Sequence, residues 1–181
     1  MEMFIRKVSM YPSLYYGFFL EFIGVRKWYT RIDKFCVLGA LPMQHNYQQI
    51  IEQENIKAIL TMNEDHELAY GIHAEEWKRL GVDYKQTAVS DYTGVASLEQ
   101  IKDSIAFINK HRSMNQNVYI HCKAGRYRSA LVTACYLIHH YQMTPEEARD
   151  KLKSLRSIVI LDKKRQMMAM NEYYDHLYKK F

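Results

Sequence analysis

Apolar residues in this 181-residue chain form short runs that suit strands and longer, spaced runs that suit helices. Runs rich in β-branched and aromatic residues predict buried strands, because both faces of such strands meet a core. Four of these runs lie at residues 35–41, 56–62, 82–89 and 117–122. Apolar positions three and four residues apart predict helices at 45–55, 73–80, 97 onward, 130–141, 144 onward and 163–180. This alternation predicts an α/β sandwich around a central, mainly parallel sheet.

Two of the predicted helices begin with a capping signal, a hydroxyl residue followed three positions later by Glu or Gln. Ser97 precedes Gln100 by three residues, and Thr144 precedes Glu147 by three. Pro145 follows Thr144 directly, and proline suits the first helical position. These signals predict where the two helices start.

One stretch joins a strand, a tight loop and a helix start, and it carries reactive side chains. The strand at 117–122 ends in Cys122, a loop containing Gly125 follows, and Arg128 and Ser129 open an apolar helix. Backbone N–H groups of such a loop, with the helix dipole, hold a tetrahedral oxyanion. The same field lowers the pKa of a cysteine, and a guanidinium grips two phosphoryl oxygens. The pattern indicates phosphoryl transfer through a phosphocysteine, with Cys122 as nucleophile.

The leaving oxygen of a phosphate ester needs a proton, which a carboxylic acid on another loop is expected to supply. Asp91 is the first candidate, because it lies on a loop after a strand and Gly94 permits a sharp turn there. Asp91 would then accept a proton from the water that cleaves the phosphocysteine. The alternative reading of Asp91 is a turn residue or a helix cap. Asp65, in the polar stretch 63–67 that we read as a loop, is the alternative acid.

Other residues of the loop have both a functional and a structural reading. Ser129 either donates a hydrogen bond to the sulfur and helps it leave, or caps the helix. His121 is expected to orient the loop through side-chain hydrogen bonds. Lys123 and Arg126 either read extra negative charge on a substrate or are plain surface charge. Tyr127 is bulky for a loop tip. Its side chain is expected to stack on the substrate, to contact lipid or to have no role.

Composition narrows the class of protein and of partner. The three cysteines, Cys36, Cys122 and Cys135, cannot all pair and show no disulfide or zinc spacing, which suggests a reducing compartment. No His/Cys cluster has the spacing of metal ligands, and the chemistry requires neither metal nor cofactor. A net charge of +5 and a pI of about 9.0 suit anionic partners such as acidic lipids, phosphates or nucleic acid.

Residues 1–27 differ from the rest of the chain in their density of aromatic side chains. Leu14, Phe18 and Phe22 fall four apart, and basic pairs flank the segment, as in helices that lie in a membrane interface. The apolar run is too short and too interrupted to span a bilayer. We therefore expect a membrane-associating or targeting segment at 1–27 and one catalytic domain at 28–181, with packing of 1–27 against that domain as the alternative.

The spacing Cys-x5-Arg-Ser, preceded by His, resembles the signature of the cysteine-dependent phosphatases. It is carried here by His121, Cys122, Gly125, Arg128 and Ser129. The resemblance implies that the α/β sandwich is of the dual-specificity phosphatase type. Loop residues expected to bind the substrate phosphate through their backbone N–H groups are Lys123, Ala124, Gly125, Arg126 and Tyr127.

Further segments resemble the mitochondrial dual-specificity-type phosphatases that hydrolyse phosphatidylglycerophosphate. They include Trp28-Tyr29-Thr30-Arg31-Ile32-Asp33, Leu38-Gly39-Ala40-Leu41-Pro42 and Asp91-Tyr92-Thr93-Gly94-Val95. The resemblance implies that phosphatidylglycerol, the precursor of cardiolipin, is made at the matrix face of the mitochondrial inner membrane. It implies an anionic phospholipid as substrate and a membrane surface as partner. It also makes the aspartate of Asp-x-Thr-Gly the general acid, in agreement with Asp91.

The chain departs from that family at three places. Tyr127 stands where the family has a small residue, and His66 where its acidic loop has an aromatic one. Residues 162–166 replace an Arg-Pro-Ser-Gln pattern, so that Gln166 is the candidate for positioning water. These changes bear on the substrate more than on the chemistry.

Three other classes of function remain open at the level of sequence: another phosphatase of the same chemistry, an RNA-processing enzyme and a non-enzymatic sensor. A dual-specificity protein phosphatase or a phosphoinositide phosphatase would use the same chemistry. An RNA 5′-triphosphatase would suit the basic pI, but Tyr127 replaces the Asn of its loop, so we expect no nucleic acid partner. A non-enzymatic phospholipid sensor is the third possibility. We expect the chain to act as a monomer.

Overall fold

The computed structural model describes residues 27–69, 71–91 and 94–179. The strands of this part form one sheet in the order β1-β2-β5-β3-β4. β1 runs antiparallel to β2, and the other neighbours are parallel, so the predicted mainly parallel sheet is confirmed. The strands are β1 (Tyr29–Arg31), β2 (Cys36–Gly39), β3 (Ile56–Thr61), β4 (Asp83–Gln86) and β5 (Asn117–His121).

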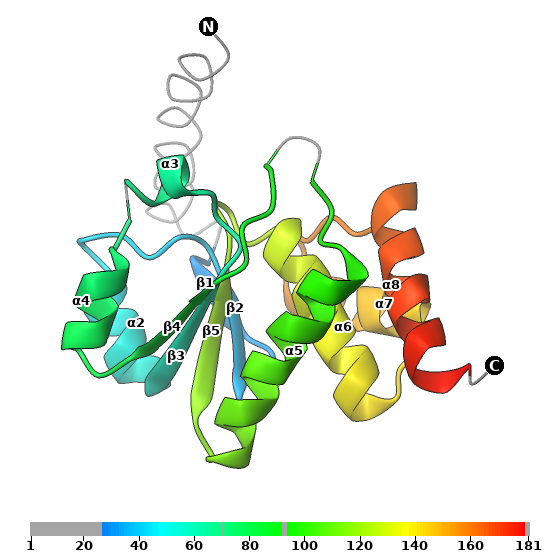
Figure 1. The fold of residues 1–181 in the computed structure, drawn as a ribbon, viewed down its shortest axis with the longest axis horizontal. Helices are drawn as coiled ribbons and strands as arrows, with labels where there is room; N and C mark the ends of the chain where they lie inside the picture. Colours follow the sequence, from blue (N-terminus) through cyan, green and yellow to red (C-terminus); the bar gives the residue numbers. More distant parts are fainter. Residues whose placement is uncertain (1–26, 70, 92–93, 180–181) are drawn as a thin grey trace, which may run out of the picture.

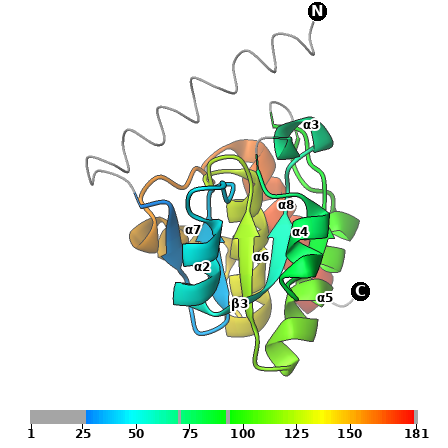
Figure 2. The same ribbon diagram turned by 90° about the vertical axis from the view of Figure 1, so that its left-hand side faces the viewer.

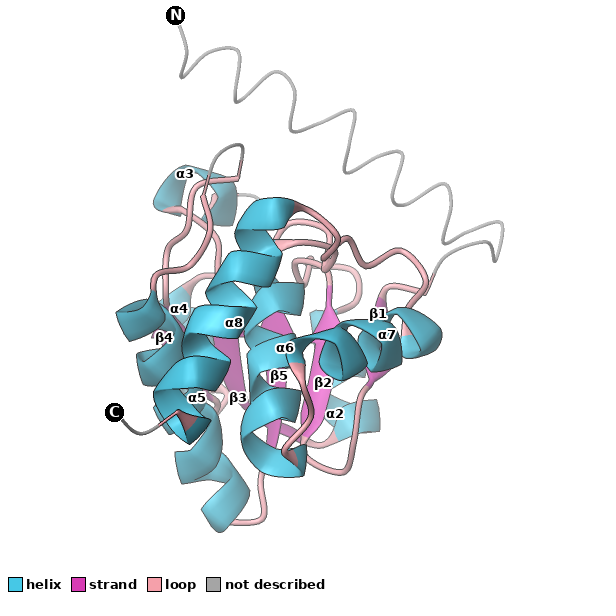
Figure 3. Ribbon diagram, turned by 90° about the vertical axis from the view of Figure 1, so that its right-hand side faces the viewer, coloured by secondary structure: helices cyan, strands magenta, loops and turns pink. Residues whose placement is uncertain are grey.

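Helices cover both faces of the sheet (Figure 1). Those of the described part are α2 (Tyr47–Glu54), α3 (Asp65–Leu68), α4 (Ala74–Arg79), α5 (Leu98–Ser113), α6 (Arg128–Tyr141), α7 (Pro145–Leu155) and α8 (Lys164–Tyr178). In Figure 3, α5, α6, α7 and α8 lie in front of the sheet, and α2 and α4 lie behind it. None of the described helices is long and apolar enough to cross a membrane.

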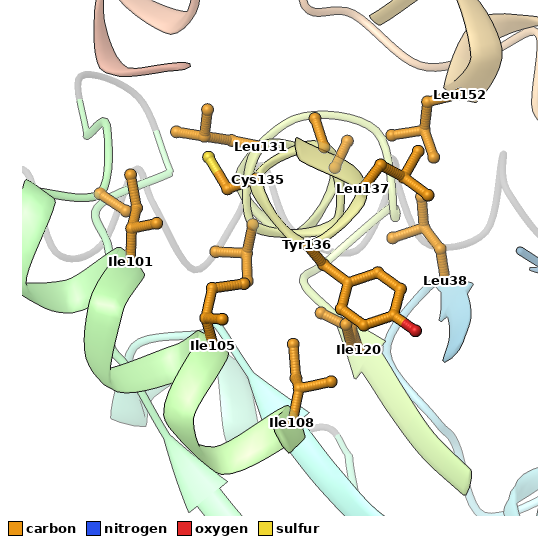
Figure 4. Close-up of a cluster of buried hydrophobic side chains, with 14 of the residues drawn as sticks. Leu38, Ile101, Ile105, Ile108, Ile120, Leu131, Cys135, Tyr136, Leu137 and Leu152 are labelled. Atoms are coloured by element: carbon orange, nitrogen blue, oxygen red, sulfur yellow. The ribbon is translucent and has the colours of Figure 1, made fainter. Parts of the chain in front are cut away.

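Alternate residues of each buried strand point to opposite faces of the sheet, which divides the core in two. On β5, Val118 and Ile120 belong to the larger cluster, together with side chains of α5, α6, α7 and α8. Tyr119 belongs to the smaller cluster, with Tyr47 of α2 and Trp77 of α4. Figure 4 shows the larger cluster around α6, where Ile105 and Ile108 of α5 approach from one side. The runs at 35–41, 56–62 and 117–122 therefore contain strands that are largely buried on both faces, as predicted. The prediction was wrong for the run at 82–89, because β4 lies at the edge of the sheet and is only partly buried.

The helix α6 is the centre of this packing. All its residues from 128 to 138 are buried, which agrees with the apolar run that predicted a central helix. The helix begins at Arg128, two residues before the predicted start at 130. Its first turn therefore includes the arginine and serine of the signature loop.

Several predicted boundaries and one element type need correction. The stretch 63–67, which we read as a loop, contains the start of the short helix α3, closed by a reciprocal capping box between Glu64 and Glu67. β1 was not predicted, because three residues at a sheet edge carry no periodic signal and only their pairing with β2 defines them. The capping boxes predicted at Ser97 and Thr144 are both present.

The carboxyl ends of the parallel strands meet at one edge of the sheet. Met62, just past β3, donates its backbone N–H to the carbonyl of His121 at 2.8 Å. Val89, past β4, donates to the carbonyl of Met62 at 3.2 Å. In Figure 2 the β3 arrow points toward this edge, above which α3 lies. The segments that follow β3, β4 and β5 are thereby brought together, and ligands bind at such edges.

The predicted segment 1–27 lies outside the described residues except for Lys27. Its association with membranes stays a prediction.

Candidate active site

The loop between β5 and α6 is held tightly against the neighbouring strand end. Gly125, in the middle of the loop, has a φ of +63°, a conformation that favours glycine. A Cβ atom there would lie 2.4 Å from the carbonyl oxygen of Gly39, at the end of β2. Leu41 also donates its N–H to the carbonyl of Lys123 at 3.4 Å. The glycine of the signature is therefore required both by its φ and by the close approach of β2.

Cys122 lies at the base of this loop and is almost fully buried, with 3% of its surface exposed. The hydroxyl of Ser129 donates a hydrogen bond to its sulfur, with Oγ 3.2 Å from Sγ. Burial alone would raise the pKa of the thiol. The positive charge of Arg128, with hydrogen bonds from the Ser129 hydroxyl and from the backbone of Ser129 and Ala124, outweighs burial and lowers the pKa below that of an ordinary thiol. A buried sulfur that favours the thiolate is suited to nucleophilic attack.

Arg128 opens α6 and is 2% exposed. Its Nη1 donates to the Glu67 carboxylate at 2.7 Å, to the carbonyl of Val89 at 2.9 Å and to that of Met62 at 3.2 Å. Its Nη2 donates to the other oxygen of Glu67 at 2.8 Å. The buried Nε has no hydrogen-bond partner among the residues that the structure describes. The guanidinium is thus fixed in place with one donor group left over.

Glu67 is the partner that the sequence reasoning missed. Its carboxylate is 2% exposed and meets Arg128 through both oxygens. Burial opposes its charge, but the hydrogen bonds and charge of Arg128 outweigh burial, so the pKa of Glu67 is lowered. The backbone N–H of Glu64 also donates to it at 2.8 Å. The acidic composition of 63–67 was a signal, but nothing in the sequence singled out Glu67 from its neighbours.

Asp91 lies beside the same arginine. Its Oδ1 forms an ion pair with Arg128 Nη2 at 2.8 Å, and its Oδ2 lies 4.0 Å from Nζ of Lys123. The Asp91 side chain keeps 30% of its surface exposed. Gly94 closes the loop by donating its N–H to the carbonyl of Ser90 at 3.1 Å, and a Cβ at Gly94 would lie 2.4 Å from that oxygen. The loop after β4 thus brings the partly exposed carboxylate of Asp91 to the guanidinium of Arg128.

The alternative acid, Asp65, is not brought to the arginine. It is exposed, and its Oδ1 accepts a hydrogen bond from Nε2 of Gln86 at 2.8 Å. Its neighbour Glu67, two residues later on α3, is the carboxylate that reaches Arg128 instead. The geometry favours Asp91 over Asp65.

His121 precedes the nucleophile and is buried, with 1% of its surface exposed. Burial lowers its pKa to about 3, so the imidazole is neutral near pH 7. Its ring lies 5.8 Å from the ring of Tyr119, and Nδ1 has no hydrogen-bond partner in the described part of the chain. The ring therefore packs against Tyr119, and the role of His121 in orienting the loop stays a prediction.

Gln166 is the third residue of α8 and is fully buried. Both polar atoms of its amide lack a hydrogen-bond partner among the described residues. The structure therefore supplies an unpartnered amide, as a residue that positions water would need, but gives no contact with Cys122 or Arg128.

The basic residues of the loop lie at its rim. Lys123 is partly exposed near Asp91, whereas Arg126 is exposed and donates through Nε to the carbonyl of Ile158 at 3.2 Å. Tyr127 immediately precedes α6, and the ammonium of Lys163 lies 5.0 Å from the centre of its ring. This cation–aromatic contact gives Tyr127 a partner that the sequence did not suggest.

The described residues contain no group of three or more His, Cys, Asp and Glu side chains arranged to hold a metal ion. Cys36 and Cys135, the other two cysteines, are buried and unpaired, and burial raises the pKa of each thiol. Among the three cysteines only Cys122 has a lowered pKa.

Comparison with known proteins agrees with this geometry. Residues 38–176 match the family described as dual specificity phosphatase, catalytic domain. The human protein named phosphatidylglycerophosphatase and protein-tyrosine phosphatase 1 is 35% identical over 181 residues, which cover 98% of this chain and 90% of that protein. The phosphatidylglycerophosphate phosphatase PTPMT1 of Arabidopsis thaliana is 33% identical and covers 93% of this chain but 49% of its own length.

A crystal structure of PTPMT1 in complex with PI(5)P is similar to this fold, with a TM-score of 0.81 at 33% identity. The match covers 84% of this chain and 98% of the other. The predicted sandwich of the dual-specificity phosphatase type is thereby confirmed. With its signature loop and these matches over most of its length, the chain belongs to the dual specificity phosphatase family and is a cysteine-based phosphatase similar to the PTPMT1 proteins.

Proposed function

We propose that this chain hydrolyses phosphatidylglycerophosphate to phosphatidylglycerol through a phosphocysteine intermediate. The observation that carries the chemistry is the buried thiol of Cys122, whose pKa is lowered beside Arg128 and Ser129. The assignment of the substrate is based on relatives that are named for phosphatidylglycerophosphate. Among them is a human protein that matches 98% of the chain.

In the first step the Cys122 thiolate attacks phosphorus, a sulfur–phosphorus bond forms and the bond to the ester oxygen breaks. Asp91, which takes up a proton from solvent after it has left Arg128, gives that proton to the ester oxygen, which leaves as the free hydroxyl of the lipid. Backbone N–H groups of residues 123–128 and the Arg128 guanidinium stabilise the negative charge on the equatorial oxygens. In the second step Asp91 accepts a proton from water, the water oxygen attacks phosphorus, and the Cys122 thiolate leaves with help from the Ser129 hydroxyl.

The acid has to leave Arg128 before it can act. In the ligand-free structure Asp91 forms an ion pair with Nη2, a position where a phosphoryl oxygen would bind. An entering phosphate carries negative charge and competes with the carboxylate for that nitrogen. Glu67 keeps the guanidinium oriented on its other side while Asp91 moves. The binding of phosphate to Arg128 therefore displaces the Asp91 carboxylate from the same nitrogen and frees it to act as the acid.

The residues around the cradle take supporting roles. Lys123 and Arg126 at the rim attract the negative charge of a phospholipid headgroup, and Ala124, Gly125 and Tyr127 contribute backbone N–H groups. His121, buried in its neutral form directly before Cys122, is assigned to orienting the loop. Gln166 is assigned to positioning water, on the strength of its unpartnered amide alone.

We infer a membrane surface as the working environment, because the substrate is a membrane lipid and the chain carries a net charge of +5. By its likeness to mitochondrial phosphatases of this type, we assign the chain to the matrix face of the mitochondrial inner membrane. The aromatic segment 1–27 is the candidate anchor. A monomer is sufficient for this chemistry, since every assigned residue comes from one chain.

A second candidate substrate is a phosphoinositide. It is favoured by the similar structure of PTPMT1 in complex with PI(5)P. Phosphoproteins are a third class, which the name of the human relative includes. All three would use the same cradle and the same nucleophile.

The test is phosphate release from a panel of substrates, each offered to wild type and to Cys122→Ser. The panel contains phosphatidylglycerophosphate and PI(5)P in mixed vesicles, a phosphotyrosine peptide and a 5′-triphosphate RNA. We expect the highest kcat/KM on phosphatidylglycerophosphate and no release by Cys122→Ser. Turnover of the phosphopeptide that exceeded lipid turnover by orders of magnitude would overturn the substrate assignment but leave the chemistry. Activity that survived in Cys122→Ser would overturn the chemistry.

A further inference from the structure

Arg156 lies just after α7 and is buried, with 4% of its surface exposed. A guanidinium has five N–H donors, and acceptors of the described residues lie on two sides of this one. On one side Nε donates to the carbonyl of Gly125 at 3.1 Å, and Nη2 reaches that of Ala124 at 3.5 Å. On the other side lie the carbonyls of Lys27 and Trp28 and the hydroxyl of Thr30, at 3.1–3.2 Å.

The segment that follows Arg156 holds the next residue of the same loop. Ile160 donates its N–H to the carbonyl of Arg126 at 2.9 Å. Arg126 returns a hydrogen bond from Nε to the carbonyl of Ile158 at 3.2 Å. We call the loop between β5 and α6 the phosphate loop. Its carbonyls at residues 124, 125 and 126 therefore point to residues 156–160.

The direction of these carbonyls decides the direction of the neighbouring N–H groups. In a peptide unit the C=O and the N–H point to opposite sides of the chain. Carbonyls that are held outward by Arg156 and Ile160 leave the loop N–H groups free to point into the cradle. Gly125, at φ +63° and in contact with Gly39, leaves the loop little room to adopt another arrangement.

We propose that Arg156 is a positioning residue of the phosphatase reaction, which holds the carbonyls of Ala124 and Gly125 outward so that the loop N–H groups face the phosphoryl oxygens. It acts through the loop backbone and does not touch the substrate. The inference rests on the proposed phosphocysteine chemistry but not on the identity of the lipid.

Residue 156 needs the planar set of N–H donors of arginine as well as its positive charge. Lysine keeps the charge but has a single nitrogen with three donors, so it cannot serve acceptors on two sides at once. Methionine keeps much of the length and removes every donor. Arg156→Lys and Arg156→Met therefore separate the charge from the planar set of donors.

The experiment measures three quantities in both variants: kcat/KM on para-nitrophenyl phosphate, inhibition by inorganic phosphate, and the pH dependence of Cys122 alkylation by iodoacetamide. Rates are normalised to the folded fraction from circular dichroism. We expect kcat/KM to fall about tenfold in Arg156→Lys and about 10²-fold in Arg156→Met, since misplacement by about 1 Å has effects of this size. Inhibition by phosphate should weaken. Alkylation should require higher pH, because Ala124, whose carbonyl accepts from Arg156, also donates the backbone N–H that helps to lower the pKa of Cys122, and a displaced Ala124 would weaken that hydrogen bond.

The matched control is Arg31→Met. Arg31 also donates to backbone carbonyls, those of Asp33, Lys34 and Glu54, but it lies away from the phosphate loop. The Arg31→Met variant should have a lower melting temperature than wild type, but the same inhibition by phosphate and the same pH dependence of alkylation. A purely structural Arg156 would behave in the same way, and that result would overturn the proposal.

A gentler variant guards against loss of folding. Thr30→Val removes one acceptor of the same guanidinium and keeps the arginine. We expect kcat/KM to fall about threefold, with the alkylation profile displaced in the same direction. If every variant that folds keeps wild-type kcat/KM and alkylation, the proposal is wrong. If wild type itself releases no phosphate, the proposed chemistry fails instead.

Discussion

At the scale of residues, one guanidinium connects the parts of the site. Arg128 meets Glu67 through two nitrogens, Asp91 through one, and leaves Nε without a partner in the described structure. A phosphoryl group that binds to Nε and Nη2 must displace Asp91 from Nη2. We therefore expect the Asp91 carboxylate to weaken the binding of anions and to speed the chemical step.

Asp91→Asn tests this double role. Turnover of a phosphate ester with a poor leaving group should fall about 10²–10⁴-fold, the usual contribution of a general acid. Inorganic phosphate should bind about two- to fivefold more tightly, because an ion pair with a partly exposed partner is worth up to about 1 kcal/mol. Both quantities come from steady-state kinetics with phosphate as competitive inhibitor. Asp65→Asn is the control and should change neither; a loss below tenfold in Asp91→Asn would move the acid role elsewhere.

The thiol of Cys122 gives a prediction about pH. Its pKa is lowered in the folded protein, so the thiolate persists as pH falls until the lowered pKa is reached. Alkylation by iodoacetamide should therefore reach half its maximal rate at a lower pH than for a free thiol, whose pKa is about 8.5. Cys36 and Cys135, whose pKa values are raised by burial, should stay unmodified in the folded state. Peptide mass spectrometry separates the three sites, and equal reactivity of all three would contradict the account.

At the scale of elements, sequence and structure agree where the signal is local. The capping boxes of α5 and α7 and the loop that joins β5 to α6 depend on residues close together in the chain, and all were predicted. Glu67 and Arg128 are 61 residues apart, so only the folded sheet brings α3 to the start of α6. The contacts of Arg156 were missed for the same reason, because their partners are 31 or more residues away in the sequence. β1 was missed because three residues at a sheet edge carry no periodic signal.

The short helix α3 carries Glu67, and Glu67→Gln tests that element. The change leaves the buried Arg128 without its main carboxylate, so stability should fall by about 3 kcal/mol. We also expect kcat/KM to fall about tenfold or more, because the guanidinium is no longer fixed. Urea unfolding and turnover of para-nitrophenyl phosphate measure the two effects. Thr144→Ala is the control: loss of that cap should cost about 1 kcal/mol and leave kcat/KM unchanged.

Glu67 also predicts how stability depends on pH. Its pKa is lowered on folding, so its contribution is complete above its unfolded value of about 4.3 and is lost as pH falls through the lowered folded value. Wild type should therefore lose more stability than Glu67→Gln between about pH 5 and pH 3. Urea unfolding at several pH values measures the difference, and parallel curves for the two proteins would contradict this assignment.

At the scale of the whole molecule, the reactive side chains lie at one edge of the sheet. Segments after β3, β4 and β5 supply Glu67, Asp91 and Cys122, and two hydrophobic clusters hold the strands in register. The fold class and the nucleophile followed from the sequence because both depend on periodicity and a local motif. The resting ion pair of Asp91 and the contact of Lys163 with Tyr127 depend on how loops meet in space, and no pattern in the sequence encodes them.

The central claim is that phosphatidylglycerophosphate loses its phosphoryl group to Cys122. The most direct measurement is rapid quenching of wild type with that lipid in vesicles, followed by peptide mass spectrometry. The account predicts one phosphoryl group on the peptide that contains Cys122, formed before phosphatidylglycerol and phosphate reach steady state. Turnover of the lipid with no phosphoryl group on Cys122, or with the same rate in Cys122→Ser, would contradict it.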